Sequence, residues 1–317
     1  MTGLLPWVIF TLAVLAMLGV DLGVFQRRAH VISFKEATLW SAVWVALSLA
    51  FNVFVYFWRG PEDALQFLTG YVLEWSLSLD NIFVFVVIFA ATGVAARLQH
   101  RVLFWGIIGA LVARGIFILA GVGLVSRFGW VLYLFGVLLL VSGAKLMFEK
   151  RKEIRPEHSK ALKLARKFLP VTGQFEGAAF FVRVDRRLFA TPLFLVLVLL
   201  EATDVLFAVD SIPAIFAVTQ DAFIIYTSNV CAILGLRAMY FMLAGAIARL
   251  RYLRAGLSAI LMFVGCKMLV AHFYRLPTLV SLAVICAILA VTILASLRAE
   301  RKTRERSMAG APSASGT

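Results

Sequence analysis

The chain has 317 residues, of which 62% are hydrophobic and only 15% are charged, and its mean hydropathy is +0.94. Soluble domains are about 45–50% apolar, so the composition excludes an ordinary soluble protein and predicts several membrane-spanning helices. The net charge of +14 would suit nucleic acid, but the basic residues follow membrane topology, and we expect no nucleic-acid partner. The cysteines form no C-x-x-C pair, so a thiol redox function has no support; they are Cys231, Cys266 and Cys286.

Nine apolar segments approach the roughly 20 residues that a helix needs to cross a bilayer. The first has no basic region before it and no A-x-A site after it, so we expect a retained helix rather than a signal peptide. The predicted spans are 4–22, 38–58, 65–91, 101–123, 129–148, 191–218, 223–247, 256–275 and 277–298. The predicted fold class is an all-α membrane protein of about nine transmembrane helices in a lipid bilayer, with its oligomeric state left open.

Lys and Arg residues are distributed unequally between the two sides of these spans. Of the 31 basic residues, 24 lie in the odd-numbered loops and the C-terminal tail or at their edges, whereas 3 lie in the even-numbered loops or at their edges. Because positively charged loops stay in the cytoplasm, the N-terminus is predicted outside and the C-terminus in the cytoplasm.

Two three-helix units are predicted to repeat each other. Each carries an acidic pair, then an arginine, then a G-x-K lysine: Arg114 and Lys145 in the first unit, Arg237 and Lys267 in the second. Three crossings are an odd number, so the second unit must enter from the opposite side, as in the inverted repeats of secondary transporters. The predicted organisation is two helices in 1–64, the first repeat in 65–148, a basic cytoplasmic loop in 149–190, the second repeat in 191–275, and a last helix with a disordered tail in 276–317.

The basic loop is the longest segment outside the spans. Its residues 158–169 can form a short amphipathic helix on the inner leaflet, and weak alternation over 175–184 predicts a small hairpin. An interfacial connector is the simplest interpretation of this loop, and a regulatory role is the alternative.

Carboxylates within the apolar spans are the main functional signal. They fall in two matching segments, E-W-S-L-S-L-D-N-I and D-V-L-F-A-V-D-S-I, and one further glutamate precedes the second segment. A charge at mid-membrane depth costs between about 2.5 and 17 kcal/mol, so such residues indicate a functional site. The candidate metal ligands are Glu74, Asp80, Glu201, Asp204 and Asp210.

Helical spacing places Glu201 and Asp204 on one face. Residues six apart lie on different faces of a straight helix, so the acids serve two sites or the helices are distorted. Pro213 favours distortion, because it leaves the carbonyl of Val209 without its helical partner. That carbonyl and the side chains of Asn81 and Ser211 would add oxygen ligands.

The candidate ligands are all oxygen atoms, which suit Mg, Ca or Mn rather than Zn or Cu. We therefore expect a hard divalent cation as a transported ion, with no permanently bound cofactor. The structural alternative is that the acids only pair with buried bases to hold the bundle together. Those bases are Arg114, Arg237, Lys145 and Lys267.

The second acidic segment and its surroundings resemble the TerC family, in particular its Alx-like branch. The resemblance is carried by T-P-L-F-L-V-L-V-L-L-E-A-T-D-V-L-F-A-V-D-S-I-P-A-I-F-A-V-T and by the later Y-T-S-N and I-L-G-L-R-A-M-Y-F. The earlier E-W-S-L-S-L-D-N-I-F-V-F and D-L-G-V-F fit as well. The resemblance implies a bacterial inner-membrane protein associated with manganese export and, in older naming, with tellurite resistance or redox modulation. It also implies that the five intramembrane acids matter for transport. Tellurite is an anion that five carboxylates would repel.

The sequence thus favours Mn²⁺ efflux through an intramembrane carboxylate site, coupled to proton or cation exchange. No P-loop or catalytic motif is present, so direct ATP use and an enzymatic activity are not expected. The alternative is a non-transporting scaffold or stress and tellurite-resistance protein that acts through partners at the basic loop. The coupling ion, the direction of transport and a role for Asp21 and Asn52 stay open.

Overall fold

The computed structural model describes residues 4–25, 33–148, 170–184, 187–244, 252–271, 273–274 and 276–309. Within these ranges the chain forms nine helices and one two-stranded hairpin. The helices are α1 (Leu4–Phe25), α2 (Phe34–Arg59), α3 (Pro61–Thr92), α4 (Ala96–Arg127), α5 (Val131–Phe148), α7 (Pro192–Phe216), α8 (Ala222–Leu243), α9 (Leu253–Val270) and α10 (Thr278–Ala309).

Eight of the described helices, all except α1, are long and apolar enough to cross a membrane. The apolar part of α1 is shorter, at Leu4–Gly19, and the apolar part of α10 ends at Ala299. The all-helical, multi-pass fold expected from the sequence is therefore confirmed, with eight candidate spans in place of about nine.

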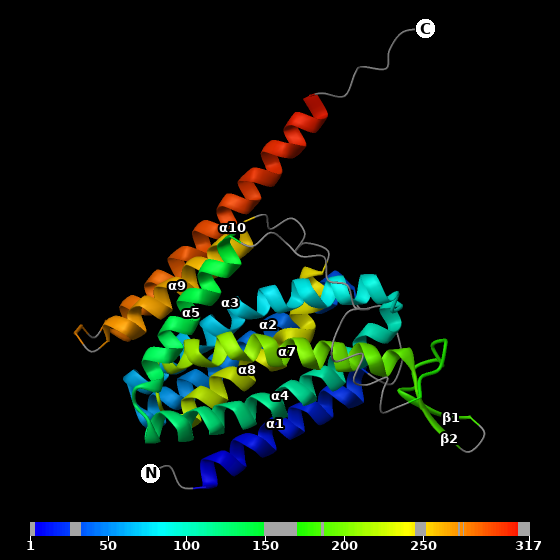
Figure 1. The fold of residues 1–317 in the computed structure, drawn as a ribbon, viewed down its shortest axis with the longest axis horizontal. Helices are drawn as coiled ribbons and strands as arrows, with labels where there is room; N and C mark the ends of the chain where they lie inside the picture. Colours follow the sequence, from blue (N-terminus) through cyan, green and yellow to red (C-terminus); the bar gives the residue numbers. More distant parts are fainter. Residues whose placement is uncertain are drawn as a thin grey trace.

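The helices form a bundle around α8 (Figure 1). α8 packs against α2, α3 and α4, and it is the most deeply buried candidate span. In contrast, α5, α9 and α10 form a group inclined to the other helices, in which α9 contacts both α5 and α10. α7 links the two groups, because it packs against α3 and α4 on one side and against α5 on the other.

Small residues bring α5 and α9 close together. A Cβ atom added to Gly265 would lie 2.8 Å from the carbonyl oxygen of Gly136, and one added to Gly143 would lie 3.1 Å from the carbonyl oxygen of Ser258. The Ser258 hydroxyl donates a 2.6 Å hydrogen bond to the Gly143 carbonyl. Small residues at helix interfaces allow this close backbone approach in membranes.

Local signals set several helix ends. Gly60, with φ of 99°, separates α2 from α3, and Pro61 begins α3 at a position where its missing N–H costs nothing. Asp221 caps the N-terminus of α8 by accepting hydrogen bonds from the backbone of Phe223 and Ile224. The α2–α3 connection and the N-terminus of α8 lie next to each other, because Arg59 donates a 3.3 Å hydrogen bond to Asp221.

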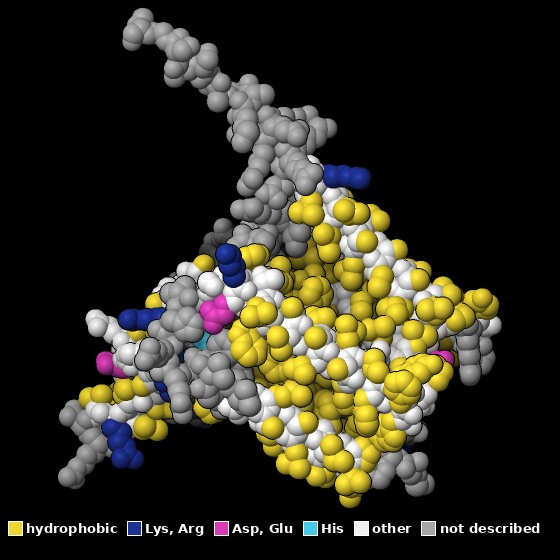
Figure 2. Space-filling model, turned by 180° about the vertical axis from the view of Figure 1, so that it is seen from behind, with side chains coloured by type: hydrophobic (Ala, Val, Ile, Leu, Met, Phe, Trp, Pro, Cys, Tyr) yellow, Lys and Arg dark blue, Asp and Glu magenta, His cyan; other side chains and the backbone are white. Residues whose placement is uncertain are grey.

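The outer surface is apolar. Figure 2 shows one face of the molecule covered largely by hydrophobic side chains, with the few charged side chains near its edges. Exposed large apolar residues on α2 and α10 include Leu47, Phe54, Leu279 and Leu294. A surface of this kind is suited to lipid, and it agrees with the multi-pass membrane fold.

The hairpin predicted within the loop is present, but further along the chain. Strand β1 (Phe181–Val184) pairs antiparallel with β2 (Arg187–Ala190), immediately before α7. The predicted amphipathic helix falls on residues 158–169, which lie outside the described part. At the C-terminus, α10 extends to Ala309, eleven residues past the predicted span, and the rest of the predicted disordered tail lies outside the described residues.

Pro213, at which the sequence predicts a distorted helix, does not end α7. α7 is a continuous helix from Pro192 to Phe216 with Pro213 inside it. Only about one turn follows the proline, so one lost hydrogen bond does not end the helix there. The backbone continues into a turn in which the N–H of Ala217 donates to the Pro213 carbonyl at 3.3 Å.

Candidate functional site

A polar cavity of about 400 Å³ lies among α3, α4, α5, α7 and α9. Three of the five predicted acids line it: Glu74, Asp80 and Asp210. Oxygen-bearing neighbours and bases share the wall with them. The other polar and charged lining residues are Asn81, Arg114, Ser142, Lys145, Ser211 and Arg254.

Arg114 is the centre of a buried hydrogen-bond network, which we call the Arg114 network (Arg114, Glu74, Asp204, Ser211 and Asn229). Its Nε and Nη2 atoms donate to the two carboxylate oxygens of Asp204 at 3.3 and 3.2 Å. Its Nη1 atom donates to Glu74 and, at 3.2 Å, to the Ser211 hydroxyl. The side-chain amide of Asn229 donates to the other oxygen of Glu74 at 2.9 Å. The network therefore joins α3, α4, α7 and α8 through one guanidinium.

Burial makes these pairings necessary. The side chains of Arg114 and Glu74 are each 2% exposed, and that of Asp204 is 6% exposed. A buried charge without a partner costs several kcal/mol, and the planar guanidinium can satisfy two carboxylates at once. Two carboxylates thus share one guanidinium. The sequence alternative of acid–base pairing holds for Glu74 and Asp204.

Asp210 lies in the same cavity but is held differently. It accepts a 2.6 Å hydrogen bond from the Ser142 hydroxyl of α5. Lys145, one turn further along α5, also lines the cavity, as do Asp80 and Asn81 of α3. The cavity thus combines carboxylate, amide and hydroxyl oxygens with basic side chains.

Glu201 faces a different space. It lines a small apolar cavity together with Asp204 and Arg237. The spacing argument that placed Glu201 and Asp204 on one face of the helix agrees with this arrangement. Asp204 lies between the two spaces, since it lines the small cavity and also binds Arg114.

Three further sequence-predicted residues line neither the polar cavity nor the small cavity beside Glu201. Lys267 lines a separate hollow of about 450 Å³ together with Tyr133 and Gln220. Val209 is 45% exposed and lines none of the cavities described here, and Pro213 is buried in the continuous α7 helix. Asn52 does not line the polar cavity either, and the side chain of Asp21 lies outside the description.

The five acids therefore do not form a single cluster. Within the described ranges, no group of three or more His, Cys, Asp or Glu side chains is arranged to hold a metal ion. Arg114 accounts for this arrangement, because it lies between Glu74 and Asp204, where a cation would be held by both. In the second segment, Asp204 and Asp210 face different spaces. In the first, Glu74 and Asp80 line the same cavity although they are also six residues apart.

Sequence reasoning missed Asn229, Ser142 and Arg254. Asn229 belongs to the Y-T-S-N stretch, where its position in an apolar helix was the available signal. Ser142 precedes Lys145 by three residues, so helical spacing puts both on one side of α5. Arg254 lies near the start of α9 and was counted only as a loop charge.

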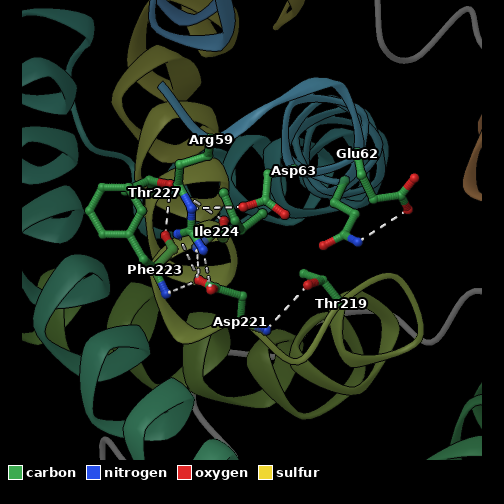
Figure 3. A network of polar contacts seen from close by, with 9 residues as sticks. Arg59, Glu62, Asp63, Thr219, Asp221, Phe223, Ile224 and Thr227 are labelled. Carbon is green, nitrogen blue, oxygen red and sulfur yellow. Dashed lines mark hydrogen bonds and ion pairs between the residues drawn. The ribbon is translucent and has the colours of Figure 1, made fainter. Parts of the chain in front are cut away.

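A second arginine network lies where α2, α3 and α8 meet, and we call it the Arg59 network (Arg59, Asp63 and Asp221) (Figure 3). Arg59 contacts Asp63 at 2.7 Å and Asp221 at 2.6 Å. Partial burial raises the pKa of the Asp221 carboxyl. Hydrogen bonds from Arg59 and from the α8 backbone lower this pKa by a larger amount, so the pKa lies below its usual value.

The fold and these networks define a multi-pass, all-helical membrane protein with a charged cavity inside its bundle. The family described as "Integral membrane protein TerC family" matches residues 59–304, so the chain belongs to the TerC family. No solved structure is significantly similar to it.

Two bacterial relatives extend over most of the chain. It is 55% identical over 291 residues to the membrane protein STKORF319 of Myxococcus xanthus. The aligned residues make up 92% of this chain and 91% of that protein. It is 47% identical over 300 residues, covering 92% and 93%, to Alx of Escherichia coli K12, which is named as a candidate membrane-bound redox modulator. The chain is therefore an Alx-like member of the family.

Proposed function

We propose that this protein exports a hard divalent cation, Mn²⁺ first among them, across the bacterial inner membrane in exchange for protons or another cation. The observation that carries the proposal is the polar cavity, in which three carboxylates face a common space at membrane depth. A structural role alone would leave no reason for this cavity, because well-packed apolar residues stabilise a bundle at least as well.

The ligands that we assign to the cation are Asp80, Asp210 and Glu74, assisted by the oxygens of Asn81 and Ser142. Such oxygen-only sets favour Mg²⁺, Ca²⁺ or Mn²⁺. We assign Asp204 to Arg114, which it contacts with both oxygens.

Basic side chains in the cavity suggest how the cation is bound and released. Arg114, Lys145 and Arg254 line the same space as the three acids. An arriving cation must therefore displace a base from a carboxylate, and the base returns when the cation leaves. Arg114 suits this role, because it can keep Asp204 while it releases Glu74.

An inverted repeat would supply the alternation between two sides of the membrane. Reciprocal packing supports it: α3 contacts α8 as α4 contacts α7, and α5 pairs with α9. Gly136 meets Gly265, and Gly143 meets Ser258. If the G-x-K lysines are aligned, these two contacts are the same contact related by a two-fold axis.

The predicted topology places the polar cavity on the cytoplasmic side. Lys145 and Arg254, which line it, lie near the ends of α5 and α9 that the positive-inside rule assigns to the cytoplasm. Lys267 lines the hollow near the opposite end of α9. We propose that the cavity receives the cation from the cytoplasm and that this hollow belongs to the release route.

The test is Mn²⁺ flux into liposomes that contain the purified protein. Asp80→Asn and Asp210→Asn keep side-chain size and remove the charge, so each should reduce the initial rate by roughly tenfold or more while the protein level holds, since losing one charge-assisted ligand costs about 1.5–3 kcal/mol. The matched control is Glu176→Gln, an exposed glutamate in the segment before β1. Normal flux in both cavity variants would remove the cavity from the transport route.

The same assay separates the alternative functions. A non-transporting scaffold or stress-resistance protein that acts through the basic loop would show no Mn²⁺ flux in the wild type. A redox role, which the name of the Alx relative suggests, would depend on the three free cysteines, of which Cys231 is buried and Cys266 and Cys286 are exposed. Transport that survives replacement of all three by Ser would exclude thiol chemistry from the cycle.

A further inference from the structure

Glu201 differs from the other predicted acids in its surroundings. Glu74 and Asp204 bind Arg114, and Asp210 accepts a hydrogen bond from Ser142. Within the described residues, the carboxyl group of Glu201 makes no hydrogen bond or ion pair. It is nonetheless partly buried in α7, within a candidate membrane span.

We propose that Glu201 is the proton-binding site of the transporter, separate from the cation site. The inference rests on the proposed function and names the coupling group that the function requires. A carboxylate without a partner at membrane depth is costly, whereas the neutral carboxylic acid is tolerated. Glu201 is therefore protonated in the state described by the structure, and it must lose its proton in another state of the cycle.

Helix α4 is shaped to receive this carboxyl group. A Cβ atom added to Gly109 would overlap all three carboxyl atoms of Glu201, and one added to Gly106 would lie 4.0 Å from its Oε1 atom. Any side chain at position 109 would thus displace the carboxyl group. The lack of a side chain at Gly109 therefore leaves the niche open, and Gly106 borders it at ordinary van der Waals distance.

The charged neighbours of Glu201 are few. Of the residues that line its small cavity, Asp204 from α7 and Arg237 from α8 carry charge. The contributions of α3 and α4 are apolar residues and a glycine, namely Phe85, Leu103, Gly106, Ile107 and Ala110. The proton affinity of Glu201 is thus set by low polarity and by the balance between Asp204 and Arg237.

The Arg114 network connects this niche with the polar cavity. Asp204, three residues after Glu201 in the same helix, holds Arg114, which also holds Glu74 in the cavity. When a cation binds Glu74, Arg114 is left with Asp204 alone and shifts toward the niche. Positive charge that approaches a carboxyl group favours its ionised form. The O–H bond of Glu201 then breaks, its electron pair stays on the carboxylate, and the proton passes to water.

The experiment compares two kinds of Mn²⁺ movement in liposomes: accumulation driven by a pH gradient, and exchange of labelled for unlabelled Mn²⁺ without a gradient. Glu201→Gln is a neutral isostere of the protonated form. We expect it to lose gradient-driven accumulation and to retain exchange, whereas Asp210→Asn should lose both. Accumulation that survives in Glu201→Gln would overturn the proposal, and loss of exchange as well would place Glu201 in the cation route instead.

A second variant tests the niche. Gly109→Ala should push the carboxyl group away and weaken coupling, while exchange continues. Gly123→Ala is the matched control in the same helix, because a Cβ atom there meets no heavy atom within 4 Å. Equal coupling in both variants would contradict the role of the niche.

A third measurement does not depend on transport. Infrared spectra of the detergent-solubilised protein at neutral pH should contain a carboxylic-acid C=O band that disappears in Glu201→Gln. Absence of this band in the wild type would overturn the assignment of Glu201. If the wild type has the band but moves no Mn²⁺, the proposed transport function is wrong. Glu201 is then protonated but does not couple protons to transport.

Discussion

The Arg59 and Arg114 networks have the same composition, one guanidinium between two carboxylates, but they occupy different regions of the molecule. The Arg59 side chain is 16% exposed, and its partners Asp63 and Asp221 are 23% and 32% exposed. The Arg114 side chain is 2% exposed, and its partners are almost as deeply buried. Water can therefore replace any lost contact in the first network, whereas the second has only protein groups available.

The origin of the carboxylates also differs. Asp63 lies in the first turn of α3, where a negative charge is favourable, and Asp221 is an N-cap that also accepts backbone hydrogen bonds. These local roles hold both acids in place whether or not Arg59 is present. Glu74 and Asp204 have no such local role and meet Arg114 from separate helices. The same chemistry thus forms a clamp between helix ends in one region and, in the proposed function, an exchangeable site within the bundle.

The largest expected effect is that of Arg114→Gln. It leaves two buried carboxylates without their main partner, and breaking a buried ion pair in this way costs about 3–5 kcal/mol. Thermal unfolding in detergent at neutral pH should show a clear loss of stability. Because protonation neutralises the abandoned acids, the loss should become smaller as the pH falls.

A compensated variant sharpens this result. Glu74→Gln and Asp204→Asn combined with Arg114→Gln removes all three charges and keeps the sizes of the two acidic side chains. This triple variant should recover most of the stability and still fail to move Mn²⁺. Transport at the wild-type rate in the triple variant would show that the Arg114 network is structural.

Arg59→Gln should have a much smaller effect. Ion pairs that water can reach contribute about 0.2–1 kcal/mol, and both acids keep their local roles. We expect a loss of stability of about 1 kcal/mol or less, measured under the same conditions, and unchanged Mn²⁺ flux. A loss as large as that of Arg114→Gln would contradict the division between clamp and site.

This division explains how much of the molecule the sequence predicted. The spans followed from apolar length, and the acids followed from their presence inside spans, since both are local properties of the chain. The alternative in which Arg114 pairs with acids was also visible from the sequence. The sequence did not show which acids Arg114 binds, because Glu74 and Asp204 are 130 residues apart and meet only through the packing of α3 against α7.

The failures have the same origin. Pro213 predicted a distorted helix by a local rule, and α7 nevertheless continues through it to Phe216. Asn229 and Ser142 became visible only when α8 and α5 brought them to Glu74 and Asp210. Lys145 and Lys267 look equivalent in the sequence, yet only Lys145 reaches the polar cavity.

The smallest expected effect concerns the pH dependence of the Arg59 network. The pKa of Asp221 is lower in the folded protein than its usual value, chiefly through Arg59 and the α8 backbone, although burial opposes this. The ionised group therefore stabilises the fold fully above the unfolded pKa of about 3.9, and this contribution is lost as the pH falls through the folded pKa. Asp221→Asn keeps a good N-cap residue and removes the titrating carboxyl group.

In unfolding experiments between about pH 6 and pH 3, the difference in the free energy of unfolding between wild type and Asp221→Asn should become smaller as the pH falls. Asp221→Ala, which also lacks the cap, should keep a constant further loss of about 1 kcal/mol relative to Asp221→Asn at every pH. A difference between wild type and Asp221→Asn that stays constant with pH would show that Arg59 does not hold the ionised form of Asp221.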